Sequence, residues 1–399
     1  TAAGAAGLLK VLGAFEHGLR PPTPHLDRVT DALADAPLRV VREPEPWTGP
    51  RRAAISAFGF GGNDAHLIVE AEAPPTRRAT ERHRIEAAPI AVVGVGARVG
   101  TLESAEALRD ALATGRGSRR ADRVRLPLEG LSPPADLEAA LAQQTMILAA
   151  ALDAVPADLD RERTGVLVGM QCDSEIARYG ARWREGEARF APVLKSAGVL
   201  GTMPNIPANR LNAQLDVRGP SYTVSADALS GIRALEIAAR ALRADELETA
   251  IVGAVELSVE PVHASAAAAV GVEDPPGDAA VVLVLERLDV AREKGRPILS
   301  VIDDEPRERV AARLGRQLGH AHAARGLLEL TALALEGRAA TLHLESLGGE
   351  RASVSLRPDP ESDDPPLVAP PARRHLELPA HPPSLLEPPS TLPRAPSLP

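Results

Sequence analysis

Short apolar runs alternate with longer helical patterns through the middle of the chain. An apolar run of strand length, bounded by turn residues, is typical of a strand buried on both faces. Helical stretches such as Ile232–Ala244 lie between these runs. Strands that alternate with helices indicate a layered α/β fold. The predicted buried strands are 90–93, 164–168, 250–255 and 279–285.

A different pattern occupies the amino-terminal part of the chain. Ala2–Glu16 carry apolar residues four positions apart and are followed by Gly18, which predicts a helix that ends at this glycine. Ala53–Phe58 and Ala65–Val69 are predicted to be short strands around the glycine turn Gly59–Gly62.

Two segments rich in proline are predicted to be linkers. Residues 73–88 contain Pro74, Pro75 and charges of both signs, and about a third of residues 358–399 are proline. Proline removes backbone hydrogen-bond donors, and the scattered apolar residues of these segments bury too little surface to offset chain entropy. We therefore expect a tail from Pro358 onward that is disordered or extended and serves as a linker.

Composition narrows the possible partners and the compartment. The net charge is −9 and no block of Lys and Arg occurs, which excludes the clustered cations that nucleic acid requires. No apolar run approaches the length of about eighteen residues that a membrane span needs. The one cysteine, Cys172, allows no intrachain disulfide and is compatible with the cytoplasm. Thr1 begins without Met or a signal peptide, so we expect a piece of a longer polypeptide.

The glycines after the strand at 90–93 do not form a dinucleotide site. Gly94, Gly96 and Gly100 are spaced one residue too far apart for that fingerprint, and no acidic residue ends a second strand at the required distance. We predict no cofactor site and no metal site in this chain.

The chain repeats part of its own pattern. The segment Gly7–Gly18 is similar to Gly326–Gly337, and the segment that begins at Gly61 and includes His66 is similar to Gly349–Leu356. Both pairs occur in the same order, a helix first and a glycine turn second. This predicts that one supersecondary unit occurs twice.

The amino-terminal segment resembles the end of a β-ketoacyl synthase domain. The family has "AAAG-x-AGL-x-K", then "EHG-x-x-PPT", and ends in "SxFGFGGTNAH". Here Thr1–Lys10, Glu16–Thr23 and Ser56–His66 match these three motifs, with Asn63-Asp64 in place of "TN". The resemblance implies that residues 1–72 are the carboxyl-terminal part of a ketosynthase domain whose cysteine and histidines lie upstream.

A second segment, residues 89–357, resembles the same family from its first strand onward. The stretch from Gly219 to Ile232 is similar to the family motif "GPS-x-TV-D-T-A-C-S-S-S-L". In this alignment the nucleophilic cysteine falls on Ala228. His320 matches the second catalytic histidine, whereas the "HGTGT" stretch with the first histidine is missing and Gly315 stands where the family has lysine.

The resemblance therefore implies a thiolase-like, layered αβαβα fold with a shortened second copy and a remnant of a first copy. A ketosynthase followed by a copy without nucleophile is similar to the ketosynthase–chain-length-factor pair of bacterial polyunsaturated fatty acid synthases. The expected function is that of a catalytically inactive, chain-length-factor-like domain. Its expected partners are a complete ketosynthase domain and acyl carrier protein, whose phosphopantetheine thioesters are the substrates of the complex.

Two alternatives remain open from the residues alone. One is a decarboxylase that acts on malonyl thioesters to supply starter units, although such relatives usually have glutamine in place of the cysteine. The other is a scaffold that docks acyl carrier protein or completes a dimer.

Individual residues carry further predictions. Ala228 should lie at the base of a relic pocket, and residues 205–245 should form the contact with the ketosynthase. His320 is expected to be a relic or a capping residue, and His322, which has no family counterpart, is expected to be solvated. Cys172 is expected to be an ordinary thiol, and His66 is expected to fasten the glycine turn rather than react.

Overall fold

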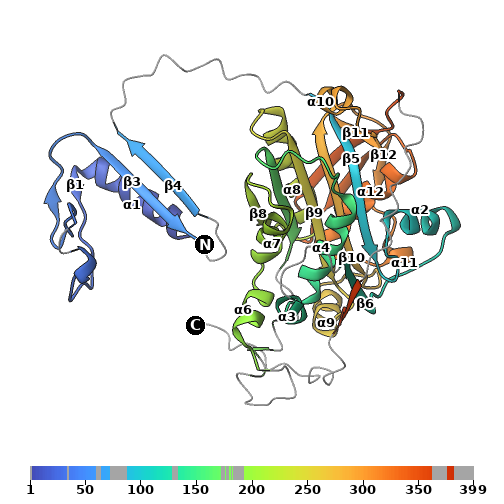
Figure 1. Cartoon of the computed structure of the whole chain (residues 1–399), viewed down its shortest axis with the longest axis horizontal. Coiled ribbons are helices and arrows are strands. Elements are labelled where there is room, and N and C mark those ends of the chain that lie inside the picture. Colours follow the sequence, from blue (N-terminus) through green and yellow to red (C-terminus); the bar gives the residue numbers. More distant parts are fainter. Residues whose placement is uncertain are drawn as a thin grey trace. The chain divides into compact units, whose positions relative to one another are not determined.

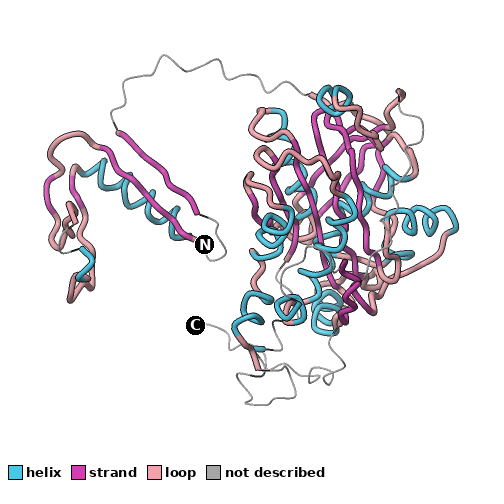
Figure 2. The backbone as a smooth tube through the Cα atoms, in the orientation of Figure 1, coloured by secondary structure: helices cyan, strands magenta, loops and turns pink. Residues whose placement is uncertain are grey.

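The structure, a computed structural model, divides the chain into two units, residues 1–84 and residues 85–399 (Figures 1 and 2). The residues that it describes are 2–33, 36–59, 64–71, 88–127, 134–171, 176, 179–180, 182, 193–361 and 375–381. Most of the predicted linker 73–88 lies outside these residues. Among the described residues, no helix is both long and apolar enough to cross a membrane.

The first unit consists mainly of one helix and one hairpin. Helix α1 (Ala3–His17) ends at Gly18, whose φ of 65° lets its N–H reach the carbonyls of Ala14 and Phe15. Strands β3 (Arg52–Phe58) and β4 (Asp64–Glu70) pair antiparallel. The helix and both strands agree with the prediction. The short elements of this unit are β1 (Leu19–Arg20), η1 (Asp31–Leu33) and β2 (Glu45–Pro46).

The described part of the second unit contains one mixed sheet of nine strands in the order β12-β13-β14-β11-β5-β10-β9-β7-β8. The strands are β5 (Ile90–Val99), β7 (Thr164–Met170), β8 (Ser221–Val224), β9 (Thr249–Leu257), β10 (Asp278–Arg287), β11 (Ser300–Asp303), β12 (Arg309–Ala311), β13 (Ala340–Glu345) and β14 (Arg351–Arg357). All four predicted buried strands are present, and each is longer than predicted. Strands β7, β8 and β9 run parallel, whereas β10 is antiparallel to both of its neighbours.

Helices cover both faces of this sheet, which explains the uninterrupted apolar runs of its strands. Along β9, Ile251 and Val255 contribute to the core on one face, and Val252 and Ala254 to the core on the other. The first face carries α4 (Ala142–Ala154), α7 (Ile206–Leu215) and α10 (Leu288–Glu293), and the second carries α2 (Ala105–Thr114), α8 (Ser230–Arg243) and α12 (Arg325–Leu335). The remaining described helices are α3 (Pro134–Glu138), α6 (Ser196–Thr202), α9 (Pro261–Ala269), α11 (Gly315–Leu318) and η2 (His322–Ala324).

Helices α8 and α12 pack closely because each has a glycine at the contact. A Cβ on Gly231 would lie 2.8 Å from Cβ of Ala254 and 3.0 Å from Cβ of Leu327. A Cβ on Gly326 would lie 2.6 Å from Cγ1 of Ile232. The pair forms a layer in which α8 contacts β7 and β9 while α12 contacts β13 and β14. This arrangement is the layered α/β class predicted from the sequence.

The predicted internal repeat has a structural counterpart. In the first unit α1 precedes the hairpin β3–β4, and in the second unit α12 precedes the hairpin β13–β14. Gly337, like Gly18, adopts a positive φ, here 62°. The two hairpins differ in their surroundings, because β13–β14 lies between β12 and β11, whereas in the described residues β3–β4 form a sheet of their own.

Part of the predicted carboxyl-terminal linker is a strand. β15 (His375–Pro379) pairs antiparallel with β6 (Arg123–Pro127). Leu378 and Ala380 are buried, and Nε2 of His381 lies 2.6 Å from Oδ2 of the buried Asp278. Residues 375–379 are extended, but the prediction that the tail is a linker that does not pack is wrong for residues 375–381. Leu376, Leu378 and Ala380 have the alternation of a strand, and this signal was outweighed by the proline content around them.

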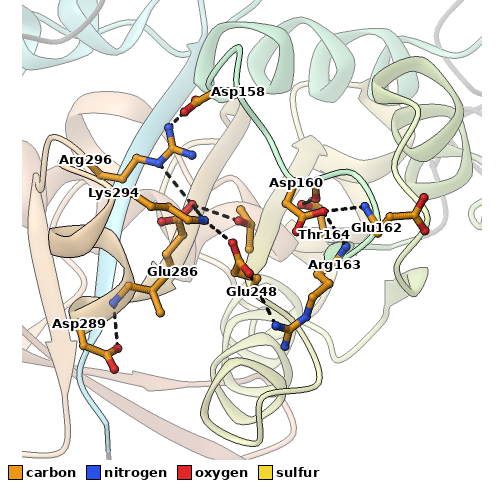
Figure 3. A network of polar contacts seen from close by, with 12 residues as sticks. Asp158, Asp160, Glu162, Arg163, Thr164, Glu248, Glu286, Asp289, Lys294 and Arg296 are labelled. Atoms are coloured by element: carbon orange, nitrogen blue, oxygen red, sulfur yellow. Dashed lines mark hydrogen bonds and ion pairs between the residues drawn. The ribbon is translucent and has the colours of Figure 1, made fainter.

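A network of charged side chains around the buried Glu286 lies at the start of the parallel strands (Figure 3). The fully buried Glu286 accepts a hydrogen bond from Oγ1 of Thr249 at 3.1 Å and pairs with Lys294 and Arg296, both at 3.4 Å. Glu248 lies 2.5 Å from Nζ of Lys294. Burial acts to lower the pKa of Lys294, but the hydrogen bonds and charges of the two glutamates raise it overall. This network joins β9, β10 and the end of α10.

Candidate functional site

The turn that carries Ala228 connects strand β8 to helix α8, at the carboxyl ends of the parallel strands β7 and β8. Ala228 is 6% exposed. Asp227 before it has a φ of 53°, a left-handed conformation that residues other than glycine rarely adopt. A sharp strand-to-helix turn is the geometry that presents a nucleophile. The left-handed residue here is the one before the position that matches the nucleophile, and the side chain at that position is a methyl group.

Hydrogen bonds hold this turn in place. The Ser230 hydroxyl donates to the carbonyl of Asp227 at 2.6 Å and accepts from the N–H of Ala226 at 2.9 Å. The Gln171 amide donates to Oγ of Ser230 at 3.2 Å and accepts from the Ser225 hydroxyl at 2.9 Å. The turn is therefore fixed by groups other than Ala228, and it needs no thiol to keep its shape.

Asp227 connects the turn to two distant segments. Its Oδ1 lies 2.9 Å from Nε2 of His322, and its Oδ2 accepts a hydrogen bond from the N–H of Leu347 at 3.0 Å. The His322 side chain is only 15% exposed, so the prediction that it is solvated is wrong. Its partner lies far away in sequence, and family motifs gave no reason to expect this contact.

Three histidines lie together beside the turn. The ring centroids of His263 and His322 are 5.4 Å apart, and those of His320 and His322 are 5.8 Å apart. Burial, together with the nearby positive charge of Arg325, lowers the pKa of His320 to about 4. Burial also lowers the pKa of His263 and, against the attraction of Asp227, that of His322. The cluster thus presents neutral imidazoles near pH 7, which can donate or accept hydrogen bonds without carrying charge.

The space that the family's lysine would need is filled. A Cβ on Gly315 would collide with the carboxylate of Asp274. A cavity of about 220 Å³ lies beside Asp274 and is also lined by His263, His320 and Ser258. Ala228 is not among its lining residues, so the predicted pocket over Ala228 remains a prediction.

Other candidate residues lie away from this cluster. His66 places Nδ1 2.9 Å from Oγ of Ser56 on the neighbouring strand, and it is Asp64 that accepts the hydrogen bond from the N–H of Gly59. The rest of the predicted glycine turn, residues 60–62, and Cys172 lie outside the described residues. Within the part of the chain that is described, no three His, Cys, Asp or Glu side chains are placed to hold a metal ion.

Sequence reasoning missed Asp227, Gln171 and Ser230 as the residues that shape the turn. Of the three, only Asp227 could have been identified from the sequence, since an aspartate stands where the family motif has the alanine that precedes the nucleophile. The roles of Gln171 and Ser230 depend on contacts that no motif describes.

Two family profiles match this chain. The β-ketoacyl synthase N-terminal domain matches residues 132–281, which include the turn at Ala228 and strands β7 to β9. The ketoacyl-synthetase C-terminal extension matches residues 24–115. Both profiles describe parts of β-ketoacyl synthases, and they match separate parts of this chain.

Curated relatives are synthases far longer than this chain. A polyunsaturated fatty acid synthase polypeptide of a Thraustochytrium species is 28% identical over 317 residues, which cover 64% of this chain and 15% of that protein. Polyketide synthase GfsA of Streptomyces halstedii is 40% identical over 97 residues, which cover 23% of this chain and 1% of that protein. The chain therefore spans a small part of the proteins that it matches.

Solved structures identify the fold. The PfaC keto synthase–chain length factor superposes with a TM-score of 0.73 at 17% identity, covering 94% of this chain and 54% of that one. The ishigamide ketosynthase/chain length factor superposes with a TM-score of 0.54 at 15% identity, covering 68% of this chain and 99% of that one. These likenesses establish the thiolase-like ketosynthase fold that was predicted.

Proposed function

We propose that the second unit is a non-catalytic, chain-length-factor-like domain that partners an active ketosynthase in a polyunsaturated fatty acid or polyketide synthase. The first unit is the end of a ketosynthase domain. The observation that carries this proposal is Ala228, a methyl group in a turn that otherwise keeps the shape of a nucleophile turn. The similarity to the polyunsaturated fatty acid synthase of Thraustochytrium and to the PfaC fold supports the same function.

Condensation by a ketosynthase needs a thiolate. The cysteine takes the acyl chain as a thioester, which divides a difficult reaction into two easier steps. The positive end of the following helix favours that thiolate. A methyl group cannot attack a thioester, so Ala228 removes the first step even though the following helix, α8, is present.

The remaining polar groups do not replace the thiol. Neutral histidines can stabilise charge on a carbonyl oxygen, and His320 is held neutral by burial. Asp274 occupies the space beside Gly315 where the family places a cation. This unit therefore lacks the nucleophile, the first histidine and the lysine, and acyl chains are expected to be carried by the partner.

The pairing surface is proposed to include strand β8. β8 is an edge strand in the described residues, hydrogen-bonded to β7 on one side, and its four residues are half-buried. An edge strand presents unpaired N–H and C=O groups that another chain can complete. β8 lies within residues 205–245, the segment predicted to contact the ketosynthase. Such a contact would bring the turn at Ala228 next to the partner's acyl tunnel and so influence chain length.

This proposal can be tested in the full synthase. Thr223→Lys, in the middle of β8, introduces a charge on the edge strand without entering the core, and Thr101→Lys, at an exposed turn, is the control. We expect the first variant to weaken assembly and change the product chain length while the second does not. Normal assembly together with an unchanged product profile for Thr223→Lys would contradict the pairing surface.

A second candidate function is decarboxylation of a malonyl thioester. The cluster of His263, His320 and His322 favours it, because neutral imidazoles beside the turn could stabilise the enolate oxygen that forms as carbon dioxide leaves. Release of carbon dioxide from malonyl-loaded acyl carrier protein by this chain alone, lost in His320→Gln, would assign the second function instead of the first.

A further inference from the structure

A second cavity, larger than the one beside the histidines, lies in the second unit. Its volume is about 640 Å³, within the range of roughly 300–1,000 Å³ that small-molecule sites occupy. It is formed by one side of α8, the end of β11, the following loop, and strands β12, β13 and β14. Apolar side chains form part of its wall: Leu235, Ala239, Ile302, Pro306 and Val354.

Each carboxylate that lines this cavity already has an arginine partner. Asp303 is held by Arg307 and by Nε of Arg357 at 3.1 Å. Burial acts to raise the pKa of Asp303, but the hydrogen bonds and charge of its partners lower it overall, so the group is ionised. The other two carboxylates are paired as well, Asp304 with Arg243 at 3.1 Å and Glu236 with Arg233 at 2.7 Å.

Two arginines that line the cavity have no such partner. Arg240 on α8 and Arg309 on β12 are exposed, and neither forms an ion pair with a carboxylate among the described residues. The cavity therefore has an excess of positive charge, although the chain as a whole carries −9. Cations that converge on a concave surface attract anions.

A polar atom in the same wall also lacks a partner. His343 places Nδ1 2.7 Å from Oγ of Ser353, while its Nε2 is buried and has no hydrogen-bond partner in the described residues. When Ser353 donates to Nδ1, Nε2 carries the proton and is a donor. A buried donor without an acceptor is unfavourable. Because solvent does not reach Nε2 in this position of the ring, an anion in the cavity would become its acceptor only if the ring turned.

We propose that this cavity binds a small organic phosphate, a diphosphate ester whose phosphates lie between Arg240 and Arg309. The guanidinium fork matches phosphate oxygens in geometry and charge, and it forms strong charge-assisted hydrogen bonds with them. The ester's organic part contacts the apolar wall around Leu235 and Val354. This site is separate from the turn at Ala228, and it does not depend on the function proposed above.

Calorimetric titration of the full chain at low ionic strength tests the site, with inorganic pyrophosphate and ADP as probes. We expect both to bind, with ADP tighter because its nucleoside contacts the apolar wall. The double variant R240Q/R309Q removes two exposed, unpaired cations. It is expected to weaken the binding of both probes by at least about tenfold. The control R316Q removes another exposed arginine, one that does not line the cavity, and is expected to bind as the wild type does.

Circular dichroism melting of both variants checks that folding is unchanged. Binding of pyrophosphate and ADP that is selectively lost in R240Q/R309Q supports the site. The proposal is overturned if neither probe binds to the wild-type chain, or if the folded double variant binds both probes as tightly as the wild type.

Discussion

The two ends of strands β7 and β9 hold different kinds of polar cluster. At the start of the strands, the buried Glu286 is paired with Lys294 and Arg296. At their carboxyl ends, Asp227 and three neutral histidines surround a turn that carries a methyl group. The loss of the Glu286 charge from the first cluster removes the one buried partner that Lys294 and Arg296 share. The second cluster tolerates alanine at the reactive position, because other side chains fix the turn.

This difference separates what the fold requires from what catalysis requires. A nucleophile contributes to the reaction and little to packing, so its replacement by alanine leaves the core intact. A single substitution should therefore lower the free energy of unfolding by different amounts in the core and in the two clusters.

The largest effect is expected for the core beside the turn. Ile232→Asp places a carboxylate at a fully buried position of α8, which we expect to lower the free energy of unfolding by about 4 kcal/mol or to unfold the second unit. Ile237→Asp is the matched control, since the same change on the same helix falls at a side chain that is 37% exposed. Denaturant unfolding of both variants measures the difference. An equal loss of unfolding free energy in both variants would contradict the assignment of Ile232 to the inner face of α8.

The histidine cluster predicts a pH dependence of stability. Burial lowers the pKa of folded His320 from 6.5 to about 4, so between these values the unfolded state binds more protons and stability falls as the pH falls. From pH 7 to pH 4 this one group accounts for a loss of about 3 kcal/mol. Unfolding measured at both pH values should show a smaller loss in His320→Gln than in the wild type. His375→Gln, an exposed control, should behave as the wild type does.

A smaller effect is expected from the charge cluster at the other end. Glu286→Gln keeps the shape of the side chain but removes the charge shared by Lys294 and Arg296, which retain Glu248 and Asp158 as partners. We expect a loss of about 2 kcal/mol in the free energy of unfolding. Glu293→Gln on the exposed side of α10 is the control. If Glu286→Gln leaves the free energy of unfolding unchanged, the proposed difference between the two clusters is wrong.

The smallest effect is expected at Asp227. Asp227→Ala removes the contacts to His322 and to the N–H of Leu347 and should cost about 1 kcal/mol. Asp216→Ala is a close control, because Asp216 also has a positive φ, 52°, but among the described residues its carboxylate forms an ion pair only with the exposed Arg161. The difference between the two variants in chemical unfolding isolates the buried contact. No difference would show that Asp227 does not fasten the turn.

Much of the fold could be predicted because its signals are local. The strands that start at Ile90 and Thr164 are covered on both faces, so their residues are apolar without interruption. The helix that ends at Gly18 and the hairpin after it were predicted from capping and turn residues. The strand His375–Pro379 was missed because the surrounding prolines outweighed its apolar alternation, and because its partner, Arg123–Pro127, is distant in sequence.

The sites were predictable only in part, for the same reason. Ala228 could be assigned from a motif, because the motif is contiguous. The contact between Asp227 and His322 spans many residues and depends on how η2 packs beside α8. The cavity with Arg240 and Arg309 is formed by segments far apart in sequence, so a search for a glycine-rich fingerprint could not find it.

The central claim is that the turn at Ala228 forms no acyl-enzyme. Its most direct test is mass spectrometry of the full chain after incubation with an acyl thioester, with the peptide of residues 219–240 analysed for a covalent acyl group. For the wild type we predict no adduct in that peptide and no condensation with malonyl thioester. Ala228→Cys is also expected not to catalyse condensation, because the first histidine and the lysine are missing as well. An acyl group on the wild-type peptide, or condensation by the unmodified chain, would contradict the account.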